Sequence, residues 1–154
     1  EILPFNRRLT EAEAEVLFIE FDLIIDGCDN FLTRQIANLA CVKLKKPLIS
    51  GAISQWEGQV SLFNETKKSA CYSCIFPVQP ADGLAPNCAE GGVMGALPGI
   101  IGSVMASEAI KNITGVGENL NDKLLIFDAL NSEFNKINVS KNPNCEICKV
   151  HHET

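Results

Sequence analysis

Four cysteines in two short motifs are the strongest chemical signal in this sequence. Each Cys-x-x-Cys motif brings two sulfur ligands to one point, and two such motifs supply the tetrahedral sulfur set that structural zinc prefers. The motifs lie 71 residues apart, counted from Cys74 to Cys145, so a shared metal would tie a long internal loop to the C-terminal tail. A redox pair of the thioredoxin type and adventitious spacing are the alternatives. We predict a closed structural zinc site with the ligands Cys71, Cys74, Cys145 and Cys148.

A second group of polar side chains follows a short apolar segment. In the stretch DLIIDGCDNFLTR, from Asp22 to Arg34, apolar residues end at two carboxylates, and a helix is expected directly behind them. In an open α/β sheet, ligands bind beyond the carboxyl ends of the strands, where a helix N-terminus attracts anions. We therefore predict a ligand site at Asp26, Cys28, Asp29 and Asn30, with Arg34 within reach of a bound phosphate.

The residues of this predicted site also have structural interpretations. Asp29 is a candidate N-cap of the following helix, because Asp and Asn are preferred at that position. If Asp29 instead faces phosphates, a magnesium ion is needed between the two negative groups. Arg34 shares a helix face with Asn30 and could reach a phosphate, and a surface salt bridge is its structural alternative.

Cys88 is the third candidate for chemistry, in the segment PNCAEGG from Pro86 to Gly92. A loop cysteine just before a helix is in the setting that lowers a thiol pKa and makes a nucleophile. A small buried filler is the alternative. Cys28 and Cys41 lie within or beside regular elements and are interpreted as packing residues.

The elements that would position these residues are predicted from apolar periodicity. Phe21–Asp26 has the pattern of a strand buried on both faces, and Leu48–Ser54 is a second apolar strand. Between them, a helix is expected over Asn30–Lys46, with its apolar stripe on Leu32, Ile36, Leu39, Ala40 and Leu44. Strand, helix and strand form a βαβ unit.

The remaining elements are a short capped helix that starts at Thr10, strands at 59–64, 123–128 and 134–140, and a helix at 95–112. Residues 65–90 lack periodicity and are expected to form a long loop. The last helix is rich in small residues, which we interpret as close packing of a buried helix on the sheet: Gly95, Ala96, Gly99, Gly102 and Ala106.

The composition fits one domain over residues 1–154, since 46% of the residues are hydrophobic. A net charge of -6 provides no electrostatic surface for nucleic acid. No uncharged run reaches the roughly 18 to 20 residues of a membrane span, and no secretion signal precedes the seven cysteines. We expect a soluble protein of the reducing cytoplasm, with neither nucleic acid nor membrane as a partner.

Together, these segments resemble the MoeB/ThiF/HesA family, bacterial relatives of ubiquitin-activating enzymes. The matching motifs follow the family's order along essentially the whole chain. They are D-x-x-D-N-x-x-x-R from Asp26, K-P-L-I-S-G from Lys46, W-E-G-Q-V from Trp56, C-Y-S-C-I-F-P from Cys71, N-C-A-E-G-G-V-M-G from Asn87, L-L-I-F-D-A-L from Leu124 and the terminal C-x-x-C.

The resemblance implies an α/β fold with a Rossmann-like mixed sheet, an antiparallel end, structural zinc and a homodimeric assembly. It also implies an enzyme that uses ATP to adenylate the C-terminal Gly-Gly carboxylate of a ubiquitin-like sulfur-carrier protein, of the molybdopterin or thiamine type. In that chemistry, Asp29 would hold magnesium on the phosphates, and Asn30 and Arg34 would line the nucleotide side. Cys88 matches a loop cysteine through which some members handle the carrier or its sulfur covalently.

The sequence departs from the family in its leading segment. No GxGxxG motif occurs in the 154 residues, and the family's ATP-clamping arginine and lysine precede the point where Glu1 begins. We expect the C-terminal portion of a ThiF-type fold, inactive in adenylation by itself. A non-catalytic zinc module that binds a ubiquitin-like partner or a catalytic subunit is the alternative. A nicotinamide dehydrogenase is disfavoured by the absent glycine motif and the paired cysteine motifs.

Overall fold

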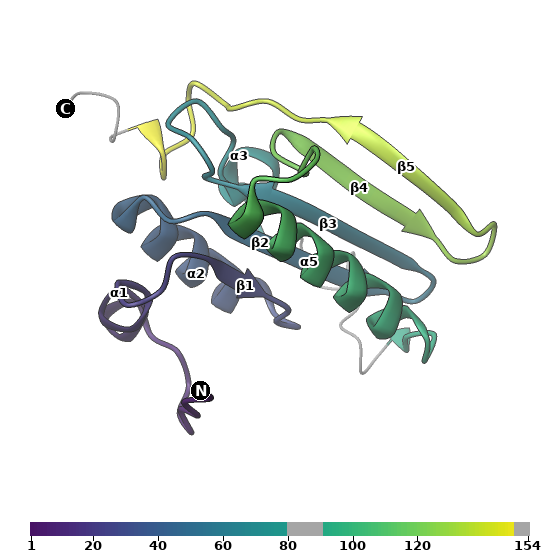
Figure 1. Ribbon diagram of the computed structural model, residues 1–154, viewed down its shortest axis with the longest axis horizontal. Coiled ribbons are helices and arrows are strands. Elements are labelled where there is room, and N and C mark those ends of the chain that lie inside the picture. The colour runs from purple at the N-terminus through teal and green to yellow at the C-terminus, as the bar shows by residue number, and fades with distance from the viewer. Residues whose placement is uncertain (80–90, 150–154) are drawn as a thin grey trace.

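Five strands form one mixed sheet, with helices on both of its faces (Figure 1). The computed structural model describes residues 1–79 and 91–149. The strands lie side by side in chain order, with β1 parallel to β2 and every later pair antiparallel. Their bounds are β1 Ile24–Asp26, β2 Leu48–Ser54, β3 Glu57–Phe63, β4 Lys123–Asp128 and β5 Glu133–Asn138.

The predicted βαβ unit is confirmed, because helix α2 (Phe31–Leu44) connects the parallel strands β1 and β2. The helix ends at Lys45, which adopts the left-handed conformation with a φ of 55°. The amide of Lys45 bonds to the last carbonyl groups of the helix, and Pro47 follows directly. The chain therefore enters β2 at the register that pairs Ile24 with Leu48.

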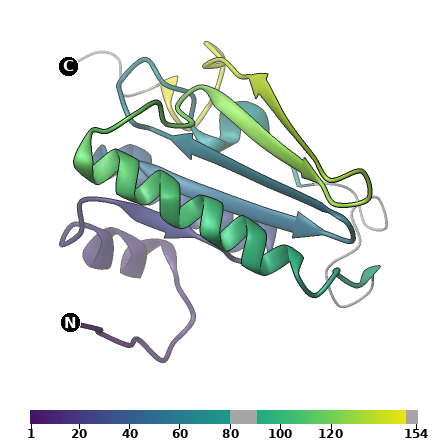
Figure 2. The ribbon, with the colours of Figure 1, turned by 45° about the vertical axis from the view of Figure 1, so that its right-hand side comes forward.

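Helix α5 (Leu97–Thr114) packs along β2 and β3 on one face of the sheet (Figure 2). Most of its buried side chains are large, and the small residues that we expected in the contact face outward. The expectation was wrong because the strands supply the space. A Cβ on Gly51 would lie 2.2 Å from Met105 Sδ, and one on Gly58 would lie 2.4 Å from Ile101. The close approach therefore depends on sheet glycines.

The prediction of a strand buried on both faces at residues 21–26 was also wrong. Strand β1 spans three residues, and Ile25 is 52% exposed between the buried side chains of Ile24 and Asp26. Ile25 pairs with Ile49, which belongs to the core cluster under α5. Because α5 covers β2 and β3, it leaves this side of β1 partly open to solvent.

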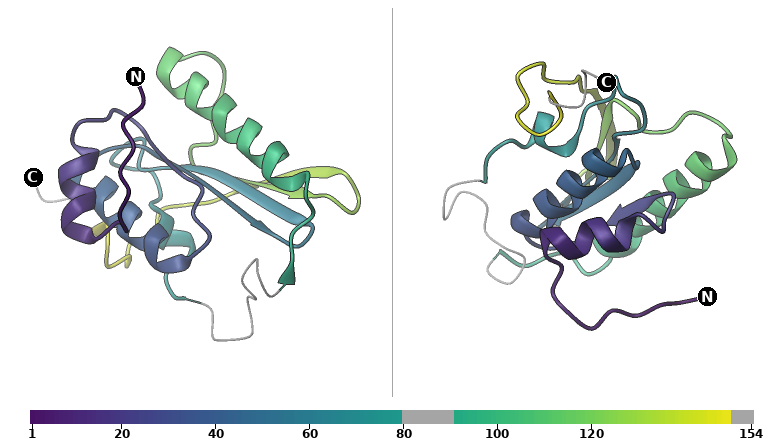
Figure 3. Two further views of the ribbon diagram at one scale, coloured as in Figure 1. Left: turned by 90° about the horizontal axis from the view of Figure 1, so that it is seen from below. Right: turned by 90° about the vertical axis from the view of Figure 1, so that its left-hand side faces the viewer.

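Two short helices complete the described structure. Helix α1 (Glu11–Phe18) has the predicted capping box between Thr10 and Glu13 and packs against α2 (Figure 3). Helix α3 (Tyr72–Ile75) is one turn within the segment that we expected to be irregular. It packs on the sheet face opposite α5, where Tyr72 contacts Phe63. Among the helices of the described residues, none has the length and apolarity to cross a membrane.

Candidate functional site

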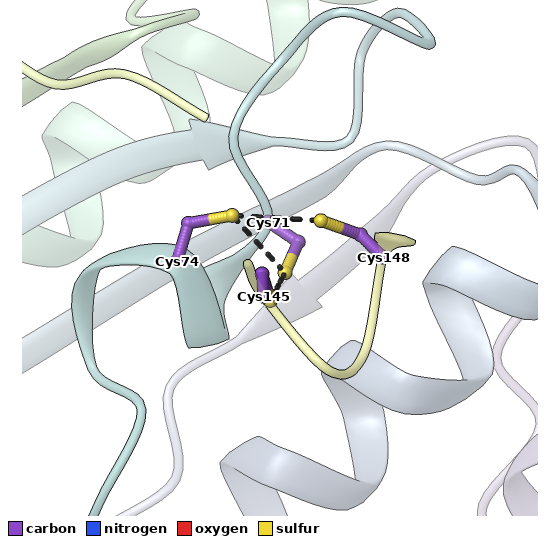
Figure 4. Close-up of side chains that lie close together, drawn as sticks. All are labelled: Cys71, Cys74, Cys145 and Cys148. Carbon is purple, nitrogen blue, oxygen red and sulfur yellow. Dashed lines mark hydrogen bonds between the residues drawn. The ribbon is translucent and has the colours of Figure 1, made fainter. Parts of the chain in front are cut away.

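The two Cys-x-x-Cys motifs meet at one point beside the second half of α2 (Figure 4). The sulfur of Cys74 lies 3.7 Å from that of Cys71 and 3.5 Å from that of Cys148, and Cys71 lies 3.6 Å from Cys145. All four sulfur atoms lie within 4.8 Å of one another. We call Cys71, Cys74, Cys145 and Cys148 the four-cysteine centre.

The spacing of these sulfur atoms fits a metal ion better than a disulfide. Ligands at about 2.3 Å from a tetrahedral zinc lie about 3.8 Å apart, close to the three distances above. A disulfide would bring two sulfur atoms to about 2.05 Å, and the cysteines of the centre are free. The centre can therefore hold a metal such as zinc in a closed site.

Hydrogen bonding and burial set the protonation of the sulfur atoms. The hydrogen bond between the sulfur atoms of Cys71 and Cys74 lowers the pKa of Cys74 to about 5 and raises the pKa of Cys71. Burial and the hydrogen bond with Cys74 raise the pKa of Cys148 to about 12. Without a cation, the thiols of Cys71 and Cys148 therefore keep their protons, and a metal ion must displace them.

A network of buried polar groups occupies the carboxyl end of β1. The two oxygens of the Asp26 carboxylate have separate partners: Oδ1 accepts from the Cys28 amide at 2.9 Å, and Oδ2 faces Arg34 Nη1 at 3.2 Å. The Ser50 hydroxyl donates to Asp26 Oδ2 and accepts from Arg34, both at 3.0 Å. Arg34 also donates to the Cys28 carbonyl. This network determines the path of the β1–α2 loop, residues 27–30.

The structure buries the side chain of Arg34 against the sheet, which the interpretation as a surface salt bridge did not anticipate. Its side chain is 9% exposed, and it forms a buried ion pair in place of the surface salt bridge that we considered. The reason is that helix position 34 faces the sheet, where Asp26 and Ser50 are register partners at the last position of the parallel pair. The signal that sequence reasoning missed is Ser50, a polar residue within the apolar strand β2.

Asp29 and Asn30 are exposed at the start of α2. The N-cap of the helix is Asn30, whose side-chain oxygen accepts from the Thr33 amide at 2.9 Å, so the interpretation of Asp29 as N-cap was wrong. The contact described for Asp29 is with its neighbour, at 3.3 Å from Asn30 Nδ2 to its carboxylate. The carboxylate of Asp29 therefore points into solvent at the carboxyl end of β1.

A cavity of about 220 Å³ opens on the sheet face opposite α5, beside the start of α2. Its walls are largely apolar and include aromatic side chains of α2 and α3, whereas its floor carries the hydroxyl groups of Ser50 and Ser61. Ser50 joins this cavity to the Asp26–Arg34 ion pair. The lining residues are Phe31, Ser50, Ala52, Gln59, Ser61, Phe63, Tyr72, Phe76, Val78 and Leu124.

Three cysteines lie outside the centre: Cys28, Cys41 and Cys88. Cys41 is fully buried in α2, as expected of a packing residue, and burial raises its pKa to about 12. Cys28 is half-buried, and burial together with Asp26 raises its pKa to about 12. Cys88 lies outside the described residues.

The ThiF family profile matches residues 1–147, and the chain belongs to this family. The sulfur carrier protein adenylyltransferase of Thermus thermophilus is 45% identical over 92% of the chain and 54% of its own length. The adenylyltransferase and sulfurtransferase MOCS3 of Drosophila virilis is 40% identical over 97% of the chain and 33% of its own length. The chain thus spans between a third and about half of these curated relatives.

The solved structures confirm the fold class. Escherichia coli MccB, crystallised with AMPCPP and MccA, superposes with a TM-score of 0.68 at 17% identity, over 95% of this chain and 44% of MccB. PaaA superposes with a TM-score of 0.62 at 17% identity, over 86% of this chain and 40% of PaaA. The chain therefore shares its mixed α/β arrangement with these Rossmann-like structures.

Proposed function

We propose that this chain is part of an enzyme that uses ATP to adenylate the C-terminal Gly-Gly carboxylate of a ubiquitin-like sulfur-carrier protein. The observation that carries the proposal is the 45% identity, over 92% of the chain, to a protein named sulfur carrier protein adenylyltransferase. The outward carboxylate at the end of β1 supports it, because that edge is where nucleotides bind in such sheets.

Asp29 has the geometry for the role of a magnesium ligand in this proposal. Its carboxylate faces solvent, whereas the other carboxylate of the motif, Asp26, is bonded inside the protein. Magnesium bound to a nucleotide is usually held by one or two carboxylates together with phosphate oxygens. Asn30 caps α2 on the nucleotide side. Arg34 lines the same side, where it holds the β1–α2 loop by donating a hydrogen bond to the Cys28 carbonyl.

The cavity beside α2 is the proposed site for the end of the carrier. A Gly-Gly terminus has no side chains, so it fits a narrow apolar space that opens toward a nucleotide. Phe31 and Ser50 lie in the wall nearest to α2, and Ser50 also contacts Arg34. The carrier carboxylate would then reach the same edge of the sheet as Asp29.

Three further features belong to this proposal. Zinc in the four-cysteine centre is structural, since four protein ligands leave no position open for a substrate. The protein acts as a homodimer. Cys88 is the nucleophile after adenylation: its thiolate attacks the acyl carbon of the carrier adenylate, so that a thioester forms and AMP leaves. For sulfur transfer, the thiolate first takes the outer sulfur of a persulfide donor, and the donor leaves as a thiol.

The test is ATP–pyrophosphate exchange with a Gly-Gly-ended carrier. By itself, the 154-residue chain should give none, because it lacks a GxGxxG phosphate-binding turn. A chimera that adds the part of the Thermus thermophilus relative not covered by this chain should exchange. In the chimera, Asp29→Ala should reduce the rate by about 10²–10³-fold, as expected for a group that stabilises transition-state charge.

The outcomes separate the two functions under consideration. Exchange by the chimera that is insensitive to Asp29→Ala would contradict the proposed role of that carboxylate. A chimera that binds the carrier but gives no exchange would favour a non-catalytic zinc module, which the absence of GxGxxG in these residues also suits. Robust exchange by the 154-residue chain would overturn the proposed division of the site.

A further inference from the structure

Asn38 lies at the contact between helix α2 and the first cysteine motif and is fully buried. Its side-chain oxygen accepts from the Tyr72 amide at 3.0 Å. Its nitrogen donates to the Ser73 hydroxyl at 3.0 Å and lies 3.8 Å from the Cys71 sulfur. One amide group therefore contacts three consecutive residues of the motif.

The orientation of this amide follows from its partners. The Tyr72 amide is a donor only, so the atom that faces it must be the oxygen of Asn38. That orientation directs the nitrogen and its two hydrogens toward Ser73 and Cys71. A hydrogen bond from a neutral donor to a thiolate disperses its negative charge, and groups of this kind tune metal sites beyond their direct ligands.

Gln35 extends the same contact by one helical turn. It accepts from the Ser73 hydroxyl at 2.6 Å, and its nitrogen donates to the Phe76 carbonyl at 2.9 Å. Within residues 1–79 and 91–149, Gln35 makes no hydrogen bond to a sulfur atom. The two amides together hold α3 to α2, but only Asn38 reaches the metal-ligand set.

Helix α2 links this contact to the ligand edge. Asn30 caps its first turn, and Arg34 bonds to Asp26 and Ser50 one turn later. Asn38 lies eight positions after Asn30, which is about 12 Å along the helix axis. A displacement of α3 and its cysteines would therefore act on the same rigid helix that carries the β1–α2 loop.

We propose that Asn38 is a positioning residue that donates a hydrogen bond to the metal-bound sulfur of Cys71 and couples occupancy of the four-cysteine centre to helix α2 and the ligand edge at its N-terminus. The inference rests on the proposed metal site. It goes beyond the proposed function because it makes the order of the ligand edge depend on the metal.

The first test measures the sulfur–metal bond directly in the metal-loaded protein. Asn38→Leu and Asn38→Asp should release zinc to a chromogenic chelator at least about 10-fold faster than the unchanged protein. With cobalt in place of zinc, both variants should shift the sulfur-to-metal charge-transfer band to longer wavelength. The reason is that a thiolate that accepts no hydrogen bond is easier to oxidise. Gln35→Leu is the matched control on the same helix and should leave the band in place.

The second test measures the coupling by amide hydrogen exchange of residues 31–35. Removal of the metal from the unchanged protein should speed exchange there as well as in α3. In Asn38→Leu, exchange of residues 31–35 should be fast in both forms, so the difference between the metal-loaded and metal-free protein should shrink. Ile101→Val, a core truncation on the other sheet face, should retain the full difference.

The outcomes that overturn the inference are distinct from those that overturn the metal site. A protein that holds no zinc overturns the metal assignment and this coupling together. If Asn38→Asp and Asn38→Leu release zinc at the same rate as the unchanged protein and show no spectral shift, the role of Asn38 alone is overturned. Metal removal that loosens α3 but leaves residues 31–35 unaffected overturns the coupling to the ligand edge.

Discussion

The four-cysteine centre and the β1–α2 loop lie along one helix, yet they are held together by different kinds of interaction. The loop is closed by bonds within a short stretch of chain, from Asp26 to Arg34, with Ser50 as the partner from β2. The centre joins cysteines that are 71 residues apart, counted from Cys74 to Cys145. The loop can therefore form from its own side chains and Ser50, whereas we expect the centre to depend on a cation that holds its four sulfur atoms together.

The comparison also distinguishes structural charge, which is paired inside the protein, from available charge, which is exposed and can bind a ligand. In the loop, the carboxylate of Asp26 and the guanidinium of Arg34 neutralise each other inside the protein, and the exposed carboxylate of Asp29 remains for a ligand. In the centre, all four ligands point inward and are directed at one another. One region is thus suited to a substrate that comes and goes, and the other to an ion that stays.

Removal of the metal is expected to have the largest effect. Purified protein should contain one zinc per chain, and Cys145→Ser should abolish it and lower the free energy of unfolding by more than roughly 5 kcal/mol. In a chain of this size, the melting temperature should fall by more than about 10 °C. Elemental analysis and thermal unfolding measure both.

Cys28→Ser is the control for the metal prediction, since Cys28 is a half-buried free cysteine outside the centre. It should leave the zinc content unchanged. If Cys145→Ser retained both zinc and melting temperature, neither would depend on the complete four-cysteine centre. The contrast between the centre and the loop would then disappear.

The two aspartates of the loop provide the next test. Asp26→Ala leaves the buried guanidinium of Arg34 without its partner and should destabilise the protein by about 3–5 kcal/mol. Asp29→Ala removes an exposed carboxylate and should change stability by less than about 0.5 kcal/mol. Urea unfolding of both variants decides this, and equal losses would contradict the division into structural and available charge.

Much of the fold could be predicted from local patterns in the sequence. The alternation of apolar segments and turn residues predicted the βαβ unit, the capping box at Thr10 and strand β4 with the bounds observed. These features depend on residues that are close together in the sequence, so local sequence patterns are enough to predict them. The paired cysteine motifs also predicted the meeting of two distant segments, because metal-ligand spacing is a local signature of a long-range contact.

The errors arose where packing involves two elements at once. The small residues of α5 face outward because Gly51 and Gly58 of the strands make room for its large side chains. The expected apolar stripe of α2 included Leu32, which is 65% exposed, while Arg34 and Asn38 are buried. A pattern of apolar residues cannot reveal these positions, since their burial depends on polar partners in β1, β2 and α3.

Alkaline pH should produce a smaller effect, through the thiol of Cys41 on the helix that joins the two regions. Burial raises its pKa from 9.0 to about 12. Below pH 9 the thiol is protonated in both the folded and the unfolded chain, so it contributes nothing to the change of stability with pH. Between pH 9 and 12 the unfolded chain releases this proton and the folded chain retains it, so stability should fall by at most about 1.4 kcal/mol per pH unit.

Urea unfolding between pH 8 and 10.5 measures this slope. Cys41→Ala should show a shallower decline with pH than the unchanged protein, whatever constant loss the truncation itself causes. Parallel declines would show that Cys41 ionises as easily in the folded state as in the unfolded chain.

The smallest effect on stability is expected from alkylation of the cysteines at neutral pH. The prediction here concerns the order in which the cysteines react. A thiolate is the reactive form, and the raised pKa values of Cys28 and Cys41 keep both thiols protonated at pH 7.5. The cysteines of the centre should be protected while metal is bound. If Cys88 is the proposed nucleophile, mass spectrometry should find it labelled first, and metal removal should then expose the centre before Cys28 reacts. Labelling of Cys88 as slow as that of Cys41 would make it a packing residue and would leave Asp29 as the residue on which the proposed chemistry of this chain depends.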